Sequence, residues 1–410
     1  MKKIAIPLAF IIGCSGINPV DLTADVKANP AGGSTKIVND NASTVTDFAV
    51  KLLSACKDTK QPNKNILLSP VSVMCALGLT SNGANGVTKA EFEKIFGIPV
   101  ETLNGLLAAY IKNLPQGEKY KLSSANSIWI KDDGKLDINK QFLQTAADYY
   151  NAEVYKTLFN SKALNAINSW VKKNTDGMID KIIDKIPSDV VMYLINALAF
   201  DAKWETEYKD HEVRDAKFYK EDGTSNDIKL MFSKENVYLE NANCTGFIKY
   251  YANRKYAFVG LLPAKGLTAD AFIATLNGET LSALLKGGRN IKVYAYLPKF
   301  TTEYAITMND ALKSMGLKMA FTNYADFSLL ANFPLKINNV IHKTYVKVDE
   351  KGTKAAAVTA VEMAKATSVR PMEEIKIVRL DRPFVYLLID VEHKLPVFIG
   401  KAMDIAEQGK

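Results

Sequence analysis

The chain has 410 residues, of which 48% are hydrophobic and 23% are charged. These fractions are typical of globular proteins and exclude a disordered or fibrous chain. The net charge is +8, but the lysines are scattered and no run of five like charges occurs, which argues against a nucleic-acid-binding surface.

The N-terminus has the pattern of an export signal. Lys2 and Lys3 precede an apolar run at 4–12, which ends at Gly13 and Cys14. A basic start and a short apolar run are typical of a secretory signal peptide, and the run is too short to span a membrane. A small residue followed by cysteine is similar to a bacterial lipoprotein signal, in which the cysteine becomes the lipid-carrying N-terminus. An ordinary signal peptide with an incidental cysteine is the alternative.

We therefore expect a signal peptide over 1–13, lipidation at Cys14 and a flexible tether over 14–44. The tether is predicted because this polar segment contains Pro19, Pro30 and paired glycines at 32–33. The protein would be a secreted, membrane-anchored lipoprotein of the bacterial cell envelope or cell surface.

The remaining cysteines are Cys56, Cys75 and Cys244. Their odd number and wide spacing argue against a disulfide framework, so we expect buried free thiols. The three histidines are far apart and form no metal-binding motif. We expect neither a metal nor a cofactor.

Helical patterns dominate the first third of the chain. Residues 44–47 and 88–91 have the spacing of capping boxes, and Gly97 follows the second helical pattern as a stop. Ser69 and Pro70 predict an N-cap followed by proline in the first turn.

Strand patterns dominate the second half. The segments 257–262 and 384–389 are continuous apolar runs, whereas 291–300 and 340–348 alternate. His342 lies on the apolar face of the last of these, which is typical of a core histidine. Helices followed by strands without strict alternation favour a single α+β domain over 45–410.

The pattern changes after Val348. Residues 349–352 are polar and end in glycine, and the alanine-rich run 353–363 favours a helix by propensity. Read with period two, however, the odd positions of this run are uncharged, and Lys354 and Glu362 both fall on the even positions. That parity indicates a strand with one buried face. The residues alone leave both interpretations open: an exposed loop or helix, and a strand in a sheet.

The run 348–357, Val-Asp-Glu-Lys-Gly-Thr-Lys-Ala-Ala-Ala, resembles the hinge of the serpins. The tail is similar to their C-terminal signature, with Asp-Arg-Pro-Phe at 381–384 and Pro-Val-Phe-Ile-Gly-Lys at 396–401. Further motifs follow the serpin order at 65–72, 83–88, 124–126, 167–171, 196–200 and 297–300. The resemblance covers about residues 45–405, and the ordered set is specific.

This resemblance implies one α+β domain with three β-sheets, about nine helices and an exposed reactive loop. It implies a monomeric suicide substrate with no catalytic residue of its own, which traps a serine endopeptidase in a covalent 1:1 complex. Cysteine endopeptidases remain open as further targets. The small residues at 355–357 fit this mechanism, because bulky side chains entering a packed sheet would cost overpacking energy.

Site residues follow from the resemblance by position. The implied hinge consists of Glu350, Gly352, Thr353, Ala355, Ala356 and Ala357. Residues on the serpin positions that hold the sheet-opening region are Ser69, Ser72, Asn196, His342 and Trp204. Lys299 would form a salt bridge with Glu350 near the base of the loop.

Family spacing counted from Gly352 places the reactive bond at Ala366 and Thr367. Ala366 suits an elastase-like pocket, and Lys365, one residue earlier, would suit a trypsin-like enzyme. Arg370 is followed by Pro371, which usually blocks cleavage.

Two other function classes are weighed against inhibition. A non-inhibitory serpin-fold binding protein usually carries charged, bulky or proline residues in the hinge, and the inward positions here have none. A hydrolase with a serine or cysteine nucleophile is disfavoured, because no Gly-x-Ser-x-Gly elbow occurs.

Overall fold

The computed structural model describes residues 18–29, 35–57, 61, 63–113, 117–132, 134, 136–353 and 374–406. Several predicted positions lie outside these residues: Cys14, Ala355, Ala356, Ala357, Lys365, Ala366 and Thr367.

Ten α-helices occur in the described residues, close to the nine expected. They are α1 (Thr35–Asp40), α2 (Ala42–Ala55), α3 (Pro70–Ser81), α4 (Gly86–Phe96), α5 (Val100–Lys112), α6 (Lys140–Thr145), α7 (Ser161–Asn174), α8 (Ala269–Ala274), α9 (Gly278–Lys286) and α10 (Asn309–Met315). Short helical turns are the π-helix η1 (Ala146–Tyr150) and the 3₁₀ turns η2 (Asp210–Glu212), η3 (Ala252–Arg254) and η4 (Met319–Phe321).

The larger layer is a seven-stranded sheet in the order β1-β4-β3-β5-β13-β12-β11. Its strands are β1 (Val20–Asp21), β3 (Tyr120–Lys131), β4 (Glu153–Thr157), β5 (Met192–Lys203), β11 (Phe300–Thr307), β12 (Asn339–Val348) and β13 (Gly352–Thr353). The last of these strands is only two residues long, and below it β5 and β12 pair directly.

The second sheet has nine strands in the order β14-β10-β7-β8-β9-β15-β16-β2, with β6 paired to β7. They are β2 (Ile66–Leu68), β6 (Val213–Tyr219), β7 (Ser225–Asn241), β8 (Cys244–Tyr250), β9 (Tyr256–Pro263), β10 (Arg289–Pro298), β14 (Ile375–Arg379), β15 (Phe384–Asp390) and β16 (Leu395–Ala402). The described strands thus form two hydrogen-bonded sheets where three were expected. The long β7 is the reason, because it pairs with β6 at one end and with β8 at the other.

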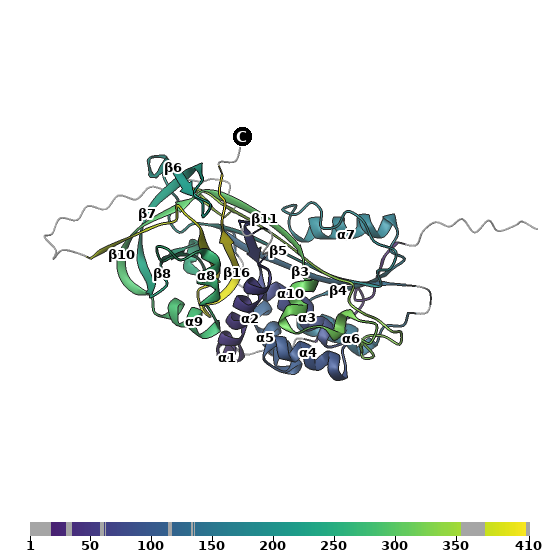
Figure 1. Ribbon diagram of the computed structural model, residues 1–410. Coiled ribbons are helices and arrows are strands. Elements are labelled where there is room, and N and C mark those ends of the chain that lie inside the picture. Colours follow the sequence, from purple (N-terminus) through teal and green to yellow (C-terminus); the bar gives the residue numbers. More distant parts are fainter. Residues whose placement is uncertain are drawn as a thin grey trace, which may run out of the picture.

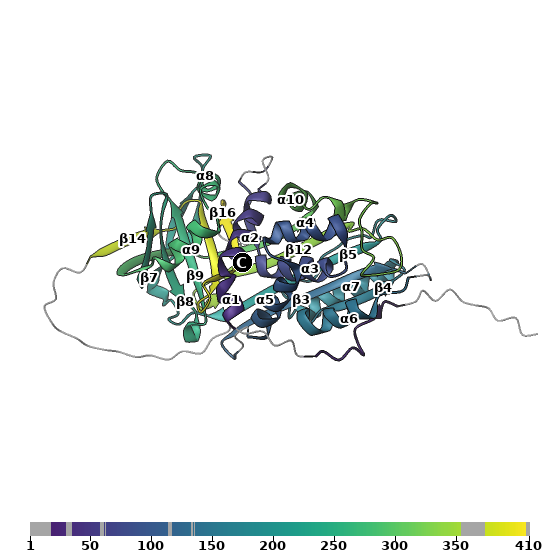
Figure 2. The ribbon, with the colours of Figure 1, turned by 90° about the horizontal axis from the view of Figure 1, so that it is seen from below.

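Helices cover both faces of the seven-stranded sheet (Figure 1). On one side α7 packs over a small cluster that includes Trp129, Tyr193 and Ile195. On the other side α2 to α6 pack over the main core, to which Leu194 and Leu198 contribute. Figure 2 shows these helices from below. Side chains of β5 therefore alternate between the two cores, as expected for a central strand.

Helix α3 lies under the centre of this sheet and is buried along its whole length. Ser69 is its N-cap and accepts a hydrogen bond from the Ser72 amide, and Pro70 opens the first turn, so this prediction is confirmed. Both predicted capping boxes are wrong, because α2 and α4 begin at Ala42 and Gly86, upstream of those residues. In α4 the Thr88 hydroxyl instead accepts a bond from the Asp326 amide, a tertiary contact that local sequence does not encode.

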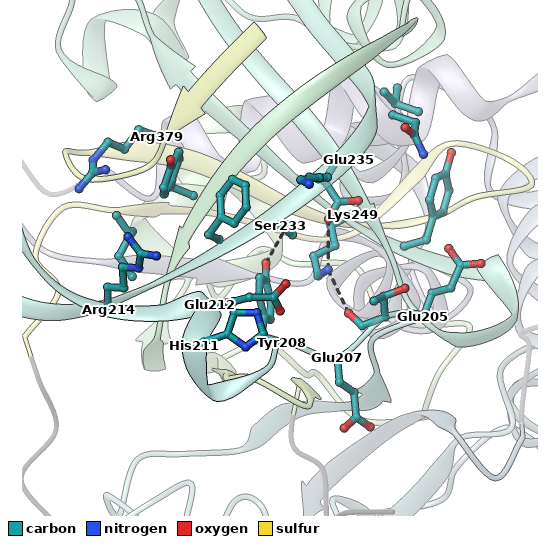
Figure 3. Close-up of a pocket in the computed structure, with 18 of the residues that line it drawn as sticks. Glu205, Glu207, Tyr208, His211, Glu212, Arg214, Ser233, Glu235, Lys249 and Arg379 are labelled. Atoms are coloured by element: carbon teal, nitrogen blue, oxygen red, sulfur yellow. Dashed lines mark hydrogen bonds and ion pairs between the residues drawn. The ribbon is translucent and has the colours of Figure 1, made fainter. Parts of the chain in front are cut away.

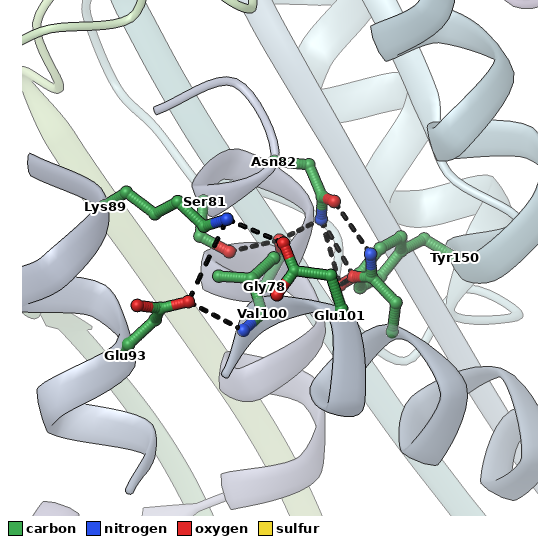
Figure 4. Close-up of polar contacts among 9 residues, drawn as sticks. Gly78, Ser81, Asn82, Lys89, Glu93, Val100, Glu101 and Tyr150 are labelled. Atoms are coloured by element: carbon green, nitrogen blue, oxygen red, sulfur yellow. Dashed lines mark hydrogen bonds and ion pairs between the residues drawn. The ribbon is translucent and has the colours of Figure 1, made fainter. Parts of the chain in front are cut away.

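A buried polar cluster fixes the far end of α3 (Figure 4). Asn82 donates to the oxygens of Gly78 and Asn104, and Tyr150 of η1 donates to the same Asn104 side chain. A side chain at Gly78 would collide with the Tyr150 hydroxyl, 2.9 Å from the position of its Cβ. These contacts tie α3 to α5 and η1, and so hold it in place under the sheet.

Part of the predicted tether packs against the domain. Val20 and Asp21 form β1, which pairs antiparallel with Lys156 and Tyr155 of the edge strand β4. Further along, the Asn29 amide donates to Asp148 at 2.7 Å. Val20 and Asp21 therefore extend the large sheet, and α1 and the start of α2 lie within the range 35–44, which differs from a free tether over 14–44.

Cys56, Cys75 and Cys244 are buried and free, as predicted, and burial raises the pKa of each thiol to about 12. None of the described helices combines the length and apolarity that crossing a membrane requires. Within the described ranges no group of three potential metal ligands comes together.

Candidate functional site

The candidate site is the place where the chain after β12 turns back into the large sheet. Gly352 pairs with Lys203 and Thr353 with Ala202, both antiparallel to β5. Thr353 also pairs with Val348 of β12. The hinge residues Gly352 and Thr353 therefore already form a strand between β5 and β12.

Gly352 is required by close packing at this point. A Cβ built there would lie 2.1 Å from the Ala202 oxygen and 2.7 Å from the Lys203 Cα. Both are backbone atoms of β5, so no side-chain adjustment can relieve the overlap. Its φ of +154° is also one that other residues rarely adopt.

A tight turn leads into this strand. The Asp349 amide donates to the Gly352 oxygen at 2.9 Å, and the Asp349 carboxylate accepts from the Lys351 and Gly352 amides. Such a side-chain-to-backbone turn fixes the direction in which the hinge enters the sheet.

The segment after β5 holds this turn from outside. Trp204 donates its indole N–H to the Asp349 oxygen at 2.8 Å and its amide to the Lys351 oxygen at 2.9 Å. The Tyr208 amide donates to the Glu350 oxygen at 2.8 Å. The Lys299 ammonium lies 2.5 Å from the Glu350 carboxylate, so the predicted pair is in contact.

The Thr353 side chain is fully buried and shares a 2.7 Å hydrogen bond with the Tyr251 hydroxyl. Tyr251 in turn stacks on Trp204 with ring centroids 4.3 Å apart. Tyr251 was not found from the sequence, because nothing in its local pattern distinguishes it from other core aromatics.

Below the hinge, β5 and β12 form a parallel seam in which Asn196 lies opposite His342. The Ser69 amide donates to His342 Nε2 at 3.1 Å, which makes Nε2 an acceptor. Nδ1 then carries the proton and donates to Asn196 Oδ1 at 2.9 Å. The imidazole is fully buried, and burial lowers its pKa to about 3, so it is neutral.

Asn196 connects this seam to the neighbouring elements. Its amide donates to the main-chain oxygen of Ser72 in α3 at 2.8 Å and to Asn126 of β3 at 2.6 Å. Thr344, next on the same face of β12, donates to the Leu67 oxygen at 2.8 Å. A polar layer thus crosses the seam, and opening the seam breaks hydrogen bonds that are shielded from water.

The structure groups the predicted residues that it describes into two adjacent sets. One set surrounds the hinge and comprises Trp204, Lys299, Glu350, Gly352 and Thr353. The other set spans the seam and comprises Ser69, Ser72, Asn196 and His342. The arrangement can hold a closed seam and a partly entered strand in one sheet. Among these described residues no nucleophile is paired with a base.

A family model described as Serpin (serine protease inhibitor) matches residues 43–405. An uncharacterised serpin-like protein of Thermococcus kodakarensis is 29% identical over 357 residues, which are 85% of this chain and 82% of that protein.

Solved structures give the same result. The thermophilic serpin tengpin in its native state is 41% identical with a TM-score of 0.87, covering 95% of this chain and 100% of that one. The latent state of tengpin gives a TM-score of 0.77. Human thyroxine-binding globulin complexed with thyroxine is 26% identical with a TM-score of 0.80, covering 90% and 100%.

Proposed function

Because this chain belongs to the serpin family, we propose that it is a suicide-substrate inhibitor of serine endopeptidases, whose cleaved loop enters the seven-stranded sheet. The observation that carries this proposal is β13, which lies between the two strands that must separate.

The register of β13 supports the proposal. Thr353 pairs with Ala202 on one side and Val348 on the other. If the antiparallel pairing continues, Thr359 arrives opposite both Asn196 and His342. The hydroxyl of an inserted threonine could then replace part of the polar contact that the seam loses.

The parity of the loop fits the two faces of the sheet. Thr353 faces the main core, so odd-numbered residues through 363 would also face it, and all are uncharged. Lys354 and Glu362 would face the side of α7. Insertion therefore buries no charge in the main core. Burying an unpaired charge there would cost several kcal/mol.

The proposed covalent step is ordinary acyl transfer. The protease serine Oγ attacks the carbonyl carbon of Ala366, its proton passes to the protease base, and the Ala366–Thr367 bond breaks. The Thr367 nitrogen leaves as an amine, and the protease stays as an ester on Ala366. Insertion of the loop then carries the protease away before water hydrolyses the ester. A cysteine endopeptidase would form a thioester in the same way.

In this proposal the seam contacts keep the sheet closed until the loop is cut. His342 and Asn196 hold the two strands together, and Ser69 and Ser72 tie them to α3. Trp204 and the Lys299–Glu350 pair fix the turn from which the hinge advances. The strain released by cleavage would drive the change.

The test is to incubate the protein with elastase and trypsin and separate the products on denaturing gels. A covalent band at the summed mass is expected, and mass spectrometry of the released C-terminal peptide distinguishes Ala366 from Lys365 as the acylated residue. If cleavage gives nicked protein without any covalent band, inhibition is the wrong function.

The alternative is a non-inhibitory binding protein, which the similarity to thyroxine-binding globulin favours. A thermal melt before and after loop cleavage separates the two functions. An inhibitor gains stability sharply on cleavage because the loop completes the sheet, whereas a binding protein of this kind gains little.

We also propose that the protein is secreted and anchored to a membrane through a lipid on Cys14. The support is the N-terminal pattern of a basic start, an apolar run and a glycine–cysteine pair. Expression of the full chain with Cys14→Ser should move the protein from the membrane fraction to the soluble fraction. Equal membrane association of both forms would contradict the lipid anchor.

A further inference from the structure

A cavity of about 940 Å³ opens at the edge of the second sheet, beside the segment that holds the hinge (Figure 3). Its floor is the middle of β7. Strand β6 pairs with β7 only as far as Met231, and β8 pairs with it only from Tyr238 onward. Between these two points the edge of β7 opposite β10 has no neighbouring strand within the described ranges.

The main chain of β7 points its hydrogen-bonding groups into this gap. The Lys299 amide donates a hydrogen bond to the Lys229 oxygen, so the main-chain N–H and C=O groups of odd-numbered β7 residues point toward β10. The Lys220 amide donates a hydrogen bond to the Thr224 oxygen, so the main-chain groups of even-numbered β7 residues point toward the side of β6. The N–H and C=O groups of Phe232 and Lys234 therefore point to the cavity, and no described residue bonds to them there. An open strand edge of this kind is a template for a further strand.

The cavity is lined by five basic and five acidic residues besides one histidine, so its formal charge favours neither a simple anion nor a simple cation. Each end carries charges of both signs, with Glu212 and Asp215 beside Arg214 at one end. Arg214, opposite Leu230 in the sheet, lies at one end and has no ion-pair partner among the described residues. The other lining arginines are paired, Arg254 with Glu205 and Arg379 with Asp381.

Three acidic residues line the opposite end, Glu205, Glu207 and Glu235, against two basic ones, Lys249 and Arg254. Lys249 bridges Glu235 and the Thr206 oxygen, and the neighbouring Glu207 lies below them with its carboxylate directed away from β7 (Figure 3). Glu235 is neutralised by Lys249, but Glu207 has no ion-pair partner in the described part of the chain. Five residue steps separate Leu230 from Glu235, which at about 3.3 Å each is roughly 17 Å.

We propose that this cavity binds a short peptide with free termini, four or five residues long, which adds to β7 as an antiparallel strand. Every described neighbour of β7 is antiparallel, and the same direction puts the peptide carboxylate at Arg214 and its ammonium group toward the end lined by Glu205, Glu207 and Glu235. Strand addition supplies main-chain hydrogen bonds independent of sequence. Peptides with both termini free are the products that endoproteolysis releases.

The site is connected to the hinge through the segment from Trp204 to Tyr208. The Lys249 side chain is 4% exposed, and its ammonium lies 4.3 Å from the centre of the Tyr208 ring and 5.2 Å from that of Trp204. The same two residues hold the turn at 349–351 by their amides. A peptide on β7 stabilises this segment, so it stabilises the hinge in its partly entered position.

The test uses the intact, uncleaved protein and no protease, so its result is independent of whether inhibition is the correct function. A pool of unblocked pentapeptides randomised at all positions is incubated with immobilised protein, and retained peptides are identified by mass spectrometry. Three comparison pools are acetylated at the N-terminus, amidated at the C-terminus, or N-methylated at alternate amides.

Unblocked peptides should be retained, and the N-methylated pool should not be, because it cannot pair with Phe232 and Lys234. Arg214→Gln should lower the affinity for the retained unblocked peptides about tenfold. The same substitution should leave the affinity for peptides with amidated C-termini unchanged. The matched control is Arg289→Gln, an exposed arginine of β10 that is paired with Glu240 outside the cavity. Retention of no unblocked peptide at millimolar concentration, or equal retention of blocked and N-methylated peptides, would overturn the proposal.

Hydrogen exchange gives the second readout. A retained peptide should slow exchange of the Tyr208 and Gly352 amides in the wild-type protein at least severalfold. Unchanged exchange at these amides with peptide bound would refute the connection to the hinge.

Discussion

Substitution of Gly352 by alanine is the sharpest test of the hinge. The added Cβ would lie 2.1 Å from the Ala202 oxygen, where ordinary contacts are 3.4–4 Å. Overpacking of this kind costs about 1–3 kcal/mol, and loss of the hydrogen bonds of the entered strand costs about 1 kcal/mol each. We expect the hinge to leave the sheet and the barrier to insertion to rise by about 3 kcal/mol, which slows insertion about 100-fold.

Two measurements follow this change. In the uncleaved protein the amide of Thr353 should exchange with solvent faster than in the wild type. In a protease titration, nicked inhibitor should accumulate at the expense of covalent complex, since slower insertion gives water time to hydrolyse the ester.

The matched control is Gly266→Ala, because Gly266 also has a positive φ, +83°, but open space around its Cβ position. This variant carries backbone strain without the overlap, and should inhibit like the wild type. Wild-type complex yield and wild-type Thr353 exchange in Gly352→Ala would refute the close-packing explanation.

Three further predictions concern the same region. Thr353→Val leaves the Tyr251 hydroxyl buried without a partner and should lower the free energy of unfolding by about 1–2 kcal/mol. Adding Tyr251→Phe in the same chain should partly restore that free energy. Chemical denaturation of the single and double variants measures both effects. Lys299→Met should cost about 1 kcal/mol or less at pH 7, since the pair with Glu350 is partly exposed. Desolvation is the largest influence on Glu350 and raises its pKa, but the hydrogen bonds from Lys299 and the backbone, together with the charges of Lys299 and Lys347, outweigh it and the net pKa is lowered. The difference between wild type and variant should therefore vanish as pH falls below about 4.5. The pKa of His342 is about 3 in the fold against an ordinary 6.5, so the free energy of unfolding should fall as pH drops from 6.5 to 3. His342→Gln should reduce the slope of the free energy of unfolding against pH by one proton. An equal slope for the variant, measured by denaturation at a series of pH values, would contradict the neutral imidazole.

Two features of the seam follow from local sequence patterns for physical reasons. The strand pattern of 340–348 puts His342 on a buried face, and the structure bonds it to Asn196 and Ser69. The cap at Ser69 is a local interaction between neighbouring residues, so its signal lies within a few positions. The family resemblance assigns Ser69, Asn196 and His342 to one region, but which of them bond to one another follows only from the structure, because periodicity does not identify tertiary neighbours.

Other features could not be predicted from local patterns. The partners of Thr353 and Asn126 are 102 and 70 residues distant in the chain, and no sequence spacing encodes such contacts. The segment 18–29 has the composition of a linker, yet it is ordered because β4 offers an open edge to Val20 and Asp21. The cavity beside β7 depends on where β6 and β8 end, and the sequence of β7 itself carries no signal for those ends.

The parallel contact between β5 and β12 has a consequence for how long the protein stays active. A strand inserted between them would exchange one parallel ladder for two antiparallel ones, and antiparallel pairing is slightly more stable per residue. Under the proposed mechanism the active fold is therefore not the arrangement of lowest free energy. The lifetime of the active fold is then set by the rate at which the seven residue pairs between β5 and β12 open spontaneously. Equilibrium unfolding measurements do not report this rate. Storage half-life at working temperature is then the quantity on which variants of the seam should be compared.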